Sequence, residues 1–369
     1  MKICLIGDYP PYKGGVSHFN FMLHKTLAAR HSVTTISWKR KYPALFYPGK
    51  EQRVGNPESG NDILFILDSV NPLTWLSAAE FINKNKFDAV VFHWLTPFMG
   101  LMFFIIAKLV KKQSRIISIC HNVLPHEKGF LDIFLTRLFS SKVDCFLLHS
   151  GREIADLKQI IKNPKLEVAY HPLYDMFENK KVPREIAKKK LGISGNVVLF
   201  FGYVREYKGL KDLIKCLPHV LKKINLTLLV VGEFWQGKKK YTKLIKDSNL
   251  EKNIILIDSY VPDNEVQNYF NASDLVAMPY RSATQSGSIQ TAFGFDVPVV
   301  CTDVGGLGES VTDGTTGFVV PKENTQKLAE AVIRYFEERK EKEFVANIKR
   351  TKERFSWKNY AALLEKCIS

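Results

Sequence analysis

Short apolar runs alternate with segments of helical periodicity along the whole chain, and this alternation constrains the fold more than any other feature. Residues 3–6 form an uninterrupted apolar run, as expected of a strand that is buried on both faces. After the loop at residues 8–15, Val16, Phe19 and Leu23 recur at the spacing of one helix face. Strands that alternate with helices predict an α/β fold with parallel sheets and crossover helices. Further strands are predicted at residues 33–37, 63–67, 89–92, 115–120 and 145–149, with a helix at 98–111.

The same pattern restarts in the second half of the chain. Residues 197–201 form a predicted strand, and Leu210 begins a helix face. Because 369 residues are too many for one ordinary core, we expect two Rossmann-like domains, with residues 176–195 as a lysine-rich linker. Two such domains facing each other would form a cleft, and open parallel sheets bind ligands beyond the carboxyl ends of their strands. The later predicted strands are residues 226–231, 254–257, 275–278, 297–301 and 318–320.

The charge of the chain is strongly positive, at +16, on a composition typical of globular proteins (46% hydrophobic, 24% charged). A phosphorylated substrate, an anionic membrane surface or nucleic acid would each complement this charge. The lysine runs at 188–190 and 238–240 fit a solvated surface equally well. No zinc-finger spacing and no aromatic-basic RNA-binding motif is present in the sequence, so we expect no nucleic acid.

The most apolar stretch, residues 94–110, is interrupted by Pro97, Gly100 and Lys108. It falls short of the roughly 20 apolar residues of a spanning helix, so we predict a buried helix and leave contact with a membrane surface open. Residues 2–6 are typical of a strand rather than of a cleavable signal, which predicts a cytoplasmic protein. Six scattered cysteines without paired spacing predict reduced, buried thiols and no metal site.

The loop at residues 10–16 ends in Gly14 and Gly15 at the predicted start of a helix. Adjacent glycines allow an anion or a sugar to approach the exposed backbone N–H groups at a helix N-terminus. A tight turn without a ligand explains the same residues. The sequence alone does not separate the two interpretations.

The loop at residues 200–209 follows a buried strand and opens a helix. Gly202 and Gly209 allow the chain to turn, and Arg205 and Lys208 place two cations beside the positive end of the helix. Fixed charge, hydrogen-bond donors and the helix dipole all favour an anion there. We therefore predict a diphosphate site at this loop, against the alternative of two ordinary surface cations.

Small and hydroxylated residues gather at 280–290, before another predicted helix. The backbone N–H groups of this loop would face the same phosphates, and Gln290, one turn into the helix, could bond a ribose. A Ser/Thr helix cap explains the hydroxyl groups and is compatible with a ligand. Paired glycines at 305–306 would let the backbone turn closely beneath the site. The predicted donor contacts of the loop are Gln285, Ser286, Gly287 and Ser288.

Several histidines lie at or near predicted strand ends. His121 directly follows the strand at 115–120, which would place it at the mouth of the cleft. A single histidine is more often structural than catalytic, and His121 is the one whose position fits contact with a donor sugar. His93, His126, His149 and His171 are further candidates.

Taken together, these segments resemble family 4 glycosyltransferases over nearly the whole chain. The likeness is carried by Pro-Pro-Tyr-Lys-Gly-Gly-Val at 10–16 and Phe-Gly-Tyr-Val-Arg-Glu-Tyr-Lys-Gly at 201–209. Later motifs are Asn-Ala-Ser-Asp at 271–274, Pro-Val-Val at 298–300, Asp-Val-Gly-Gly at 303–306, Gly-Thr-Thr-Gly-Phe at 314–318 and Phe-Ser-Trp at 355–357. No single motif is decisive, but their order and spacing make chance agreement improbable.

The resemblance implies the GT-B fold and a retaining hexosyltransferase that uses a nucleotide-sugar donor and no metal or other cofactor. Arg205 and Lys208 would neutralise the leaving diphosphate, and His121 would contact the donor sugar. The implied domains are an acceptor-binding domain at 1–175, a donor-binding domain at 196–352, and a final helix at 353–369 that crosses back to the first domain.

One departure from the family pattern concerns two glutamates seven residues apart. The matching positions hold Ser282 and Gln290, neither of which is acidic. A Thr-Gln-Ser-Gly segment stands at 284–287, which suggests a subgroup in which Gln285 and the backbone replace a carboxylate.

Two alternative functions therefore stay open. A degenerate partner subunit that binds donor or another protein without turnover would fit the missing glutamates, whereas the intact Arg205 and Lys208 argue against such decay. A nucleotide-sugar epimerase on the same fold would need carboxylates in the cleft. For a transferase, basic charge and apolar surface suggest a lipid-linked or cell-surface glycan acceptor at the cytoplasmic face of an anionic membrane.

Overall fold

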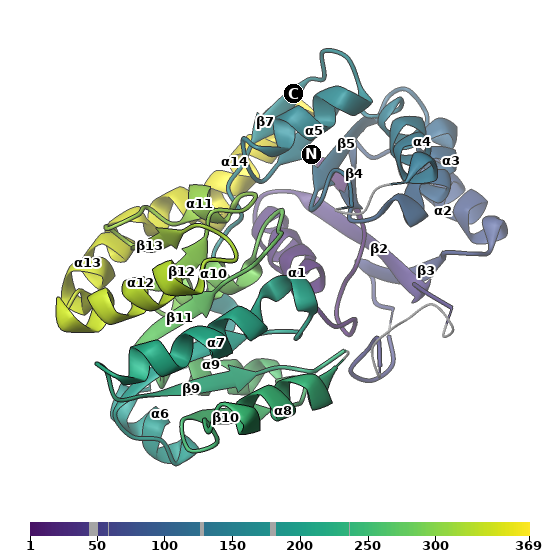
Figure 1. Cartoon of the computed structure of the whole chain (residues 1–369). Coiled ribbons are helices and arrows are strands. Elements are labelled where there is room, and N and C mark those ends of the chain that lie inside the picture. The colour runs from purple at the N-terminus through teal and green to yellow at the C-terminus, as the bar shows by residue number, and fades with distance from the viewer. Residues whose placement is uncertain (44–50, 58, 126–128, 178–181, 236) are drawn as a thin grey trace. The chain divides into compact units, whose positions relative to one another are not determined.

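The computed structural model describes residues 1–43, 51–57, 59–125, 129–177, 182–235 and 237–369. Contacts divide the chain into two compact units. Unit 1 comprises Met1–His171 and Ser356–Ser369, and unit 2 comprises Pro172–Phe355 (Figure 1). Each unit has its own hydrophobic core around a parallel sheet. The predicted α/β fold is therefore confirmed.

Unit 1 is built on a seven-stranded sheet of order β3-β2-β1-β4-β5-β6-β7, in which every pairing is parallel. The edge strand β7 was not predicted, because its three residues are only half-buried and lack a continuous apolar run. The strands are β1 (Lys2–Ile6), β2 (Ser32–Arg40), β3 (Ile63–Asp68), β4 (Ala89–Trp94), β5 (Arg115–Cys120), β6 (Cys145–Leu148) and β7 (Leu166–Val168). The helices are α1 (Gly15–Ala28), α2 (Pro72–Asn85), α3 (Gly100–Leu109), α4 (Phe130–Ser140), α5 (Glu153–Ile160) and α14 (Trp357–Ile368).

Unit 2 is built on a six-stranded parallel sheet of order β10-β9-β8-β11-β12-β13. Its strands are β8 (Asn196–Phe201), β9 (Leu226–Val231), β10 (Ile254–Ile257), β11 (Leu275–Met278), β12 (Val299–Thr302) and β13 (Gly317–Val320). Its helices are α6 (Arg184–Leu191), α7 (Leu210–Leu221), α8 (Lys238–Asp247), α9 (Asp263–Asn271), α10 (Gly287–Gly294), α11 (Leu307–Ser310), α12 (Thr325–Glu337) and α13 (Glu341–Thr351).

The last helix, α14, belongs to unit 1, where it packs on α1 and on β5, β6 and β7. A disulfide joins Cys367 of α14 to Cys145 of β6. The expectation of six reduced thiols is wrong for this pair, because a separation of 222 residues hides the pairing from any spacing rule. The other cysteines are free and buried. In the part of the chain that the structure describes, no helix is long and apolar enough to cross a membrane.

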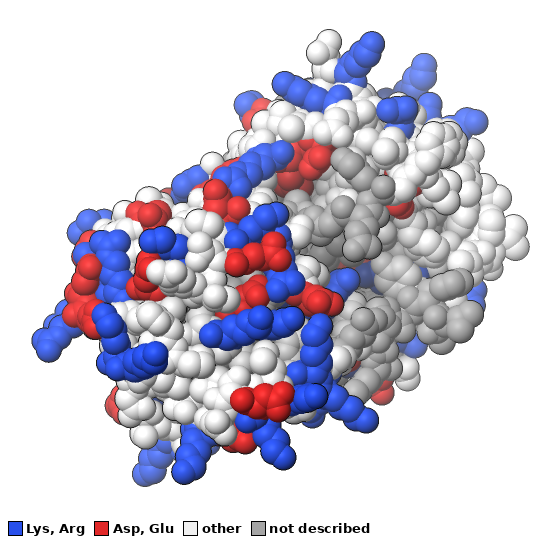
Figure 2. All heavy atoms as spheres, in the orientation of Figure 1, with Lys and Arg blue, Asp and Glu red and all other residues white. Residues whose placement is uncertain are grey.

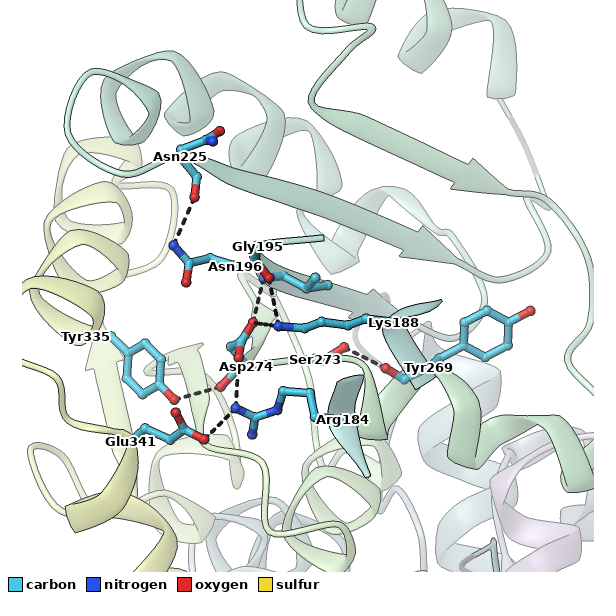
Figure 3. Close-up of polar contacts among 11 residues, drawn as sticks. Arg184, Lys188, Gly195, Asn196, Asn225, Tyr269, Ser273, Asp274, Tyr335 and Glu341 are labelled. Carbon is cyan, nitrogen blue, oxygen red and sulfur yellow. Dashed lines mark hydrogen bonds and ion pairs between the residues drawn. The ribbon is translucent and has the colours of Figure 1, made fainter. Parts of the chain in front are cut away.

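The Asn-Ala-Ser-Asp motif ends in Asp274, a buried carboxylate at the amino edge of the sheet in unit 2 (Figure 3). Its Oδ2 accepts a hydrogen bond from the backbone N–H of Val197 at 2.7 Å and one from Lys188 Nζ at 3.1 Å. Its Oδ1 accepts one from Arg184 at 2.9 Å, and the Tyr335 hydroxyl donates to its carbonyl at 2.7 Å. Asp274 thus ties α6 and α12 to the start of β8 and β11, and the motif has a structural role.

The segment 176–195, which we predicted as a linker, contains α6. Arg184 bonds Glu341 as well as Asp274, and the Lys188 ammonium also donates to the carbonyl of Gly195 at 2.7 Å. Residues 184–191 are therefore part of the packed structure of unit 2, and residues 178–181 lie outside the described chain.

Candidate functional site

The loop after β8 turns at Gly202, whose φ of +101° is readily adopted by glycine. A Cβ at this position would lie 3.1 Å from Lys208 Nζ and 3.7 Å from Ser288 Oγ. The ammonium of Lys208 and the hydroxyl of Ser288 therefore both lie close to Gly202. This arrangement brings the loop at 200–209 and the start of α10 together, as predicted from their places at strand ends.

The Lys208 ammonium is half-buried and bonds no carboxylate among the described residues. It lies 5.4 Å from the centre of the Tyr280 ring, a cation–π distance. Burial lowers the pKa of Lys208, Tyr207 opposes that shift and Arg205 adds to it. An unpaired cation in this setting favours a bound anion, which would supply the missing negative charge.

Arg205 is exposed, and its guanidinium lies between two aromatic rings. It is 5.0 Å from the centre of the Tyr207 ring and 5.1 Å from that of the Trp235 ring. No carboxylate pairs with it in the described part of the chain. The rings hold the guanidinium at the carboxyl edge of the sheet without neutralising it. Sequence reasoning missed Trp235, although its position four residues after the end of β9 follows the same strand-end rule.

Gly209 ends the loop and caps α7 with a φ of +70°. A Cβ here would lie 1.8 Å from the carbonyl oxygen of Pro279, so no other residue fits without moving the backbone. The glycine therefore presses the turn that carries Lys208 against the end of β11. Its role is to position the cation.

Tyr280 is buried beneath this turn and connects it to the next loop. Burial raises the pKa of Tyr280 to about 12, and hydrogen bonds with Ser286 and Ser288 oppose the rise. The hydroxyl is therefore neutral, and it lies near both serines at the start of α10. Gly287 lies against the Tyr174 ring, where a Cβ would be 2.7 Å from Cε2. Gln285 is half-buried in the same loop.

Gln290 is fully buried in α10, and neither atom of its amide has a hydrogen-bond partner among the described residues. Leaving a buried amide unpaired costs about 1–3 kcal/mol. The predicted bond to a ribose would satisfy the amide only if the side chain became uncovered. That contact stays a prediction.

The paired glycines at 305–306 meet the loop at 280–290 directly. The N–H of Gly306 donates to the carbonyl of Thr284 at 2.8 Å, and the Thr302 hydroxyl donates to the carbonyl of Tyr280 at 2.5 Å. The loops after β11 and β12 are therefore joined through their backbones.

In unit 1, four histidines surround the buried Phe19 near the carboxyl ends of β4 to β7. Ring centres lie 4.9 Å from Phe19 for His121 and 5.8 Å for His93. The ring centres of His149 and His171 lie 5.4 and 5.1 Å from that of Phe19. His126 lies outside the described residues. Burial lowers the pKa of His93 to about 3 and that of His121 well below its usual range. The imidazoles of His93 and His121 are therefore neutral at physiological pH, and that of His121, which is partly exposed, suits hydrogen bonding to a sugar hydroxyl.

The orientation of His121 depends on His93. The Nδ1 of His93 lies 3.0 Å from Nε2 of His121, while Nε2 of His93 is buried without a partner among the described residues. A proton on Nδ1 of His93 avoids burying an unpaired N–H and donates to His121. His121 then carries its own proton on Nδ1, where it can donate to a ligand.

Gly14 precedes α1 with a φ of +113°, and no atom lies within 4 Å of the place a Cβ would take. Its carbonyl accepts hydrogen bonds from the N–H groups of Ser17 and His18. The helix begins at Gly15 with open space beside it. Gly14, Gly15 and His121 belong to unit 1, whereas the other predicted site residues belong to unit 2.

Comparison with known proteins connects this geometry to an activity. Residues 195–338 match the family described as Glycosyl transferases group 1, a segment that carries both the Lys208 loop and the Ser288 loop. A protein in the cps region of Klebsiella pneumoniae is 26% identical over 72% of this chain and 76% of its own length. A teichuronic acid biosynthesis glycosyltransferase of Bacillus subtilis is 26% identical over 58% of this chain and 52% of its own length.

Among solved structures, Anabaena HepE in complex with UDP is similar, with a TM-score of 0.76 over 99% of both chains at 17% sequence identity. At this identity the likeness shows the fold alone, which is the predicted GT-B fold of two parallel-sheet α/β domains. The family match and the relatives confirm the sequence-based prediction of a glycosyltransferase.

Proposed function

We propose that this protein is a retaining glycosyltransferase that moves a sugar from a nucleoside-diphosphate sugar to an anionic, cell-surface glycan acceptor. One observation carries the donor side of the proposal. Arg205 and Lys208 lie at the carboxyl end of β8 and pair with no carboxylate among the described residues. Negative charge builds on the departing diphosphate as the sugar bond breaks, so cations fixed beforehand stabilise the transition state more than the ground state.

The remaining residues have assigned roles in this proposal. Ser288, beside Lys208, donates to a phosphate oxygen, and the N–H groups at the start of α10 face the same anion. His121 donates from Nδ1 to a hydroxyl of the donor sugar. The two cations provide the charge that a metal ion would otherwise supply, so we propose transfer without a metal. Retention of configuration follows from the family resemblance, and NMR of the anomeric proton of the product measures it.

The acceptor class is proposed from two relatives. One lies in a cps region, and another is named for teichuronic acid biosynthesis, an acidic polymer by its name. The net charge of +16 complements an anionic acceptor.

We also propose that unit 1 contacts an anionic membrane through α2, α3 and α4. Phe130 is 87% exposed, Leu131 64% and Phe134 51%, all on α4. Packing of α3 between α2 and α4 extends this apolar surface to neighbouring helices. Figure 2 shows few charged side chains over these helices. The ammonium groups of Lys108 and Lys142 lie 5.9 and 5.7 Å from the centre of the Phe104 ring and would meet lipid phosphates. Leu73, Leu76, Phe98, Leu101 and Leu109 are the other exposed apolar residues there.

Sedimentation with anionic liposomes at low salt tests the membrane contact. The pair Phe130→Ser and Phe134→Ser should release the protein, whereas Ile186→Ser, an exposed apolar residue of α6, should not. Failure of the unaltered chain to sediment would refute the contact.

The donor side is tested by a thermal-shift panel of UDP, GDP and ADP with their common sugar conjugates. One nucleotide family should raise the thermal midpoint of the unaltered chain. Lys208→Ala should abolish that shift, while Lys215→Ala, an exposed lysine of α7, should keep it. No shift with any nucleotide would contradict donor binding and favour a partner subunit.

A further inference from the structure

A groove of about 550 Å³ lies in unit 1 at the carboxyl end of β2. Its volume is within the range of small-molecule sites, roughly 300–1,000 Å³. Residues 39–42 form one wall, residues 51–53 with 55–56 form another, and Tyr12 contributes from the glycine loop. All of these residues belong to unit 1.

The walls of the groove are held by backbone hydrogen bonds. The N–H of Lys13 donates to the carbonyl of Gln52 at 2.9 Å, and the N–H of Val54 donates to that of Pro11 at 2.8 Å. The Gln52 side chain in turn donates to the carbonyl of Tyr42 at 3.0 Å. Segment 51–54 is therefore fixed to both neighbouring loops, and the groove is a built feature of the fold.

Four cations and one carboxylate line the groove. Two of the cations form ion pairs with carboxylates that are not part of the lining. Lys41 pairs with Asp8 at 2.5 Å, and Arg40 pairs with Asp68 at 2.7 Å. The lining carboxylate, Glu51, is 3.8 Å from Lys13.

The other two cations, Lys39 and Arg53, pair with no carboxylate in the described part of the chain. The groove therefore presents a positive charge of about two that the described residues do not compensate.

Two tyrosine rings lie beside the cations of the groove. Burial raises the pKa of Tyr12 and of Tyr42, so both hydroxyls stay neutral. The Arg53 guanidinium lies 5.9 Å from the centre of the Tyr12 ring, and Lys41 Nζ lies 5.1 Å from that of Tyr42. Tyr12 is 4% exposed and Tyr42 is half-buried, so the rings support the cations, and the cations suit an acidic group.

We infer that this groove binds the anionic group of the acceptor, a phosphate or a carboxylate. The inference rests on the proposed transferase function and assigns acceptor selection to Lys39 and Arg53. A neutral acceptor would leave the charge of both side chains uncompensated. The donor diphosphate has its own cations, Arg205 and Lys208, in unit 2.

Titration calorimetry tests the groove with farnesyl diphosphate as a lipid-phosphate probe, glucuronate as an acidic-sugar probe and glucose as a neutral probe. The titrations use the Arg205→Ala/Lys208→Ala chain, which removes the proposed donor cations. Adding Lys39→Gln and Arg53→Gln should weaken binding of one anionic probe at least tenfold. The probe that responds identifies the source of the anion.

A control pair, Lys84→Gln and Arg115→Gln, removes the same charge from exposed positions outside the groove and should change affinity less than twofold. The inference would be overturned if both pairs of substitutions reduced affinity equally. It would also be overturned if glucose bound as tightly as the anions, or if neither anion bound. UDP binding, measured separately with intact Arg205 and Lys208, should be the same with and without the groove pair. The donor proposal can therefore fail independently of the groove.

Discussion

At each of the two edges of the sheet in unit 2, one arginine and one lysine lie close together, and the two pairs are used in opposite ways. At the amino edge, Arg184 and Lys188 bond Asp274, a buried carboxylate that also accepts a backbone N–H (Figure 3). At the carboxyl edge, Arg205 and Lys208 contact aromatic rings and bond no carboxylate among the described residues.

This difference distinguishes structural charges from charges kept for a ligand. A buried charge costs free energy unless a partner compensates it. Asp274 provides that compensation within the fold, so its cations contribute to stability. Near Lys208 no described carboxylate provides it, and in the proposed donor complex a diphosphate would. The following predictions test the comparison, from the largest expected effect to the smallest.

The largest effect is expected for Lys208→Ala on turnover. Removing one preorganised donor to the departing charge should lower kcat by about 10²–10³, or roughly 3–4 kcal/mol. The thermal midpoint of the ligand-free protein should not fall, because the ammonium is desolvated without a carboxylate partner. Kinetics and a thermal melt of the same preparation measure both. A large drop in the midpoint would show that Lys208 is structural instead.

For Asp274→Asn the opposite pattern is expected. The substitution leaves Lys188 buried without a counter-charge and should reduce the free energy of unfolding of unit 2 by about 3 kcal/mol. Turnover per folded molecule at low temperature should stay unchanged. Denaturant unfolding and active-site titration measure these quantities, with Glu330→Gln, an exposed ion pair, as the control. Loss of turnover without loss of stability would contradict the comparison.

Nucleotide affinity should depend on pH through Lys208. The diphosphate favours the protonated amine. Nucleotide affinity is therefore highest below the pKa of Lys208 and falls as the pH rises through it. Because burial lowers that pKa, the loss should begin below the ordinary range of lysine and approach about tenfold per pH unit. Lys208→Arg, whose guanidinium stays charged, should remove this loss of affinity at alkaline pH. If the arginine variant still lost affinity at alkaline pH, the titrating group would be one other than Lys208.

The smallest effect on nucleotide binding is expected for Arg281→Gln. Arg281 lies in the same loop as Gln285, yet both its Nε and its terminal nitrogen bond Asp212 at 2.9 Å. It is therefore already neutralised, like Arg184, and UDP affinity should change less than twofold while the melting temperature falls. Fluorescence or calorimetric titration tests this, and a tenfold loss would show that pairing does not separate the two classes of cation.

Most of the sheet architecture could be predicted from the sequence, because a strand buried on both faces leaves a continuous apolar run, as in β8. The short edge strand β7 and helix α6 were missed, since one is half-buried and the other is lysine-rich. In the candidate site, Gly202 and Lys208 were found from their place at a strand end. Their neighbour Tyr280 was not assigned a role, because its place beneath Lys208 depends on contacts between separate loops.

The sequence by itself determined the strand–helix order, the glycine turns and the types of side chain at each strand end, since these depend on local periodicity and backbone freedom. Only the tertiary structure decided which cations are neutralised. Arg184 and Asp274 are 90 residues apart, and Cys145 and Cys367 are 222 apart. Charge compensation depends on distances of a few ångströms between such segments, and folding alone brings those segments together.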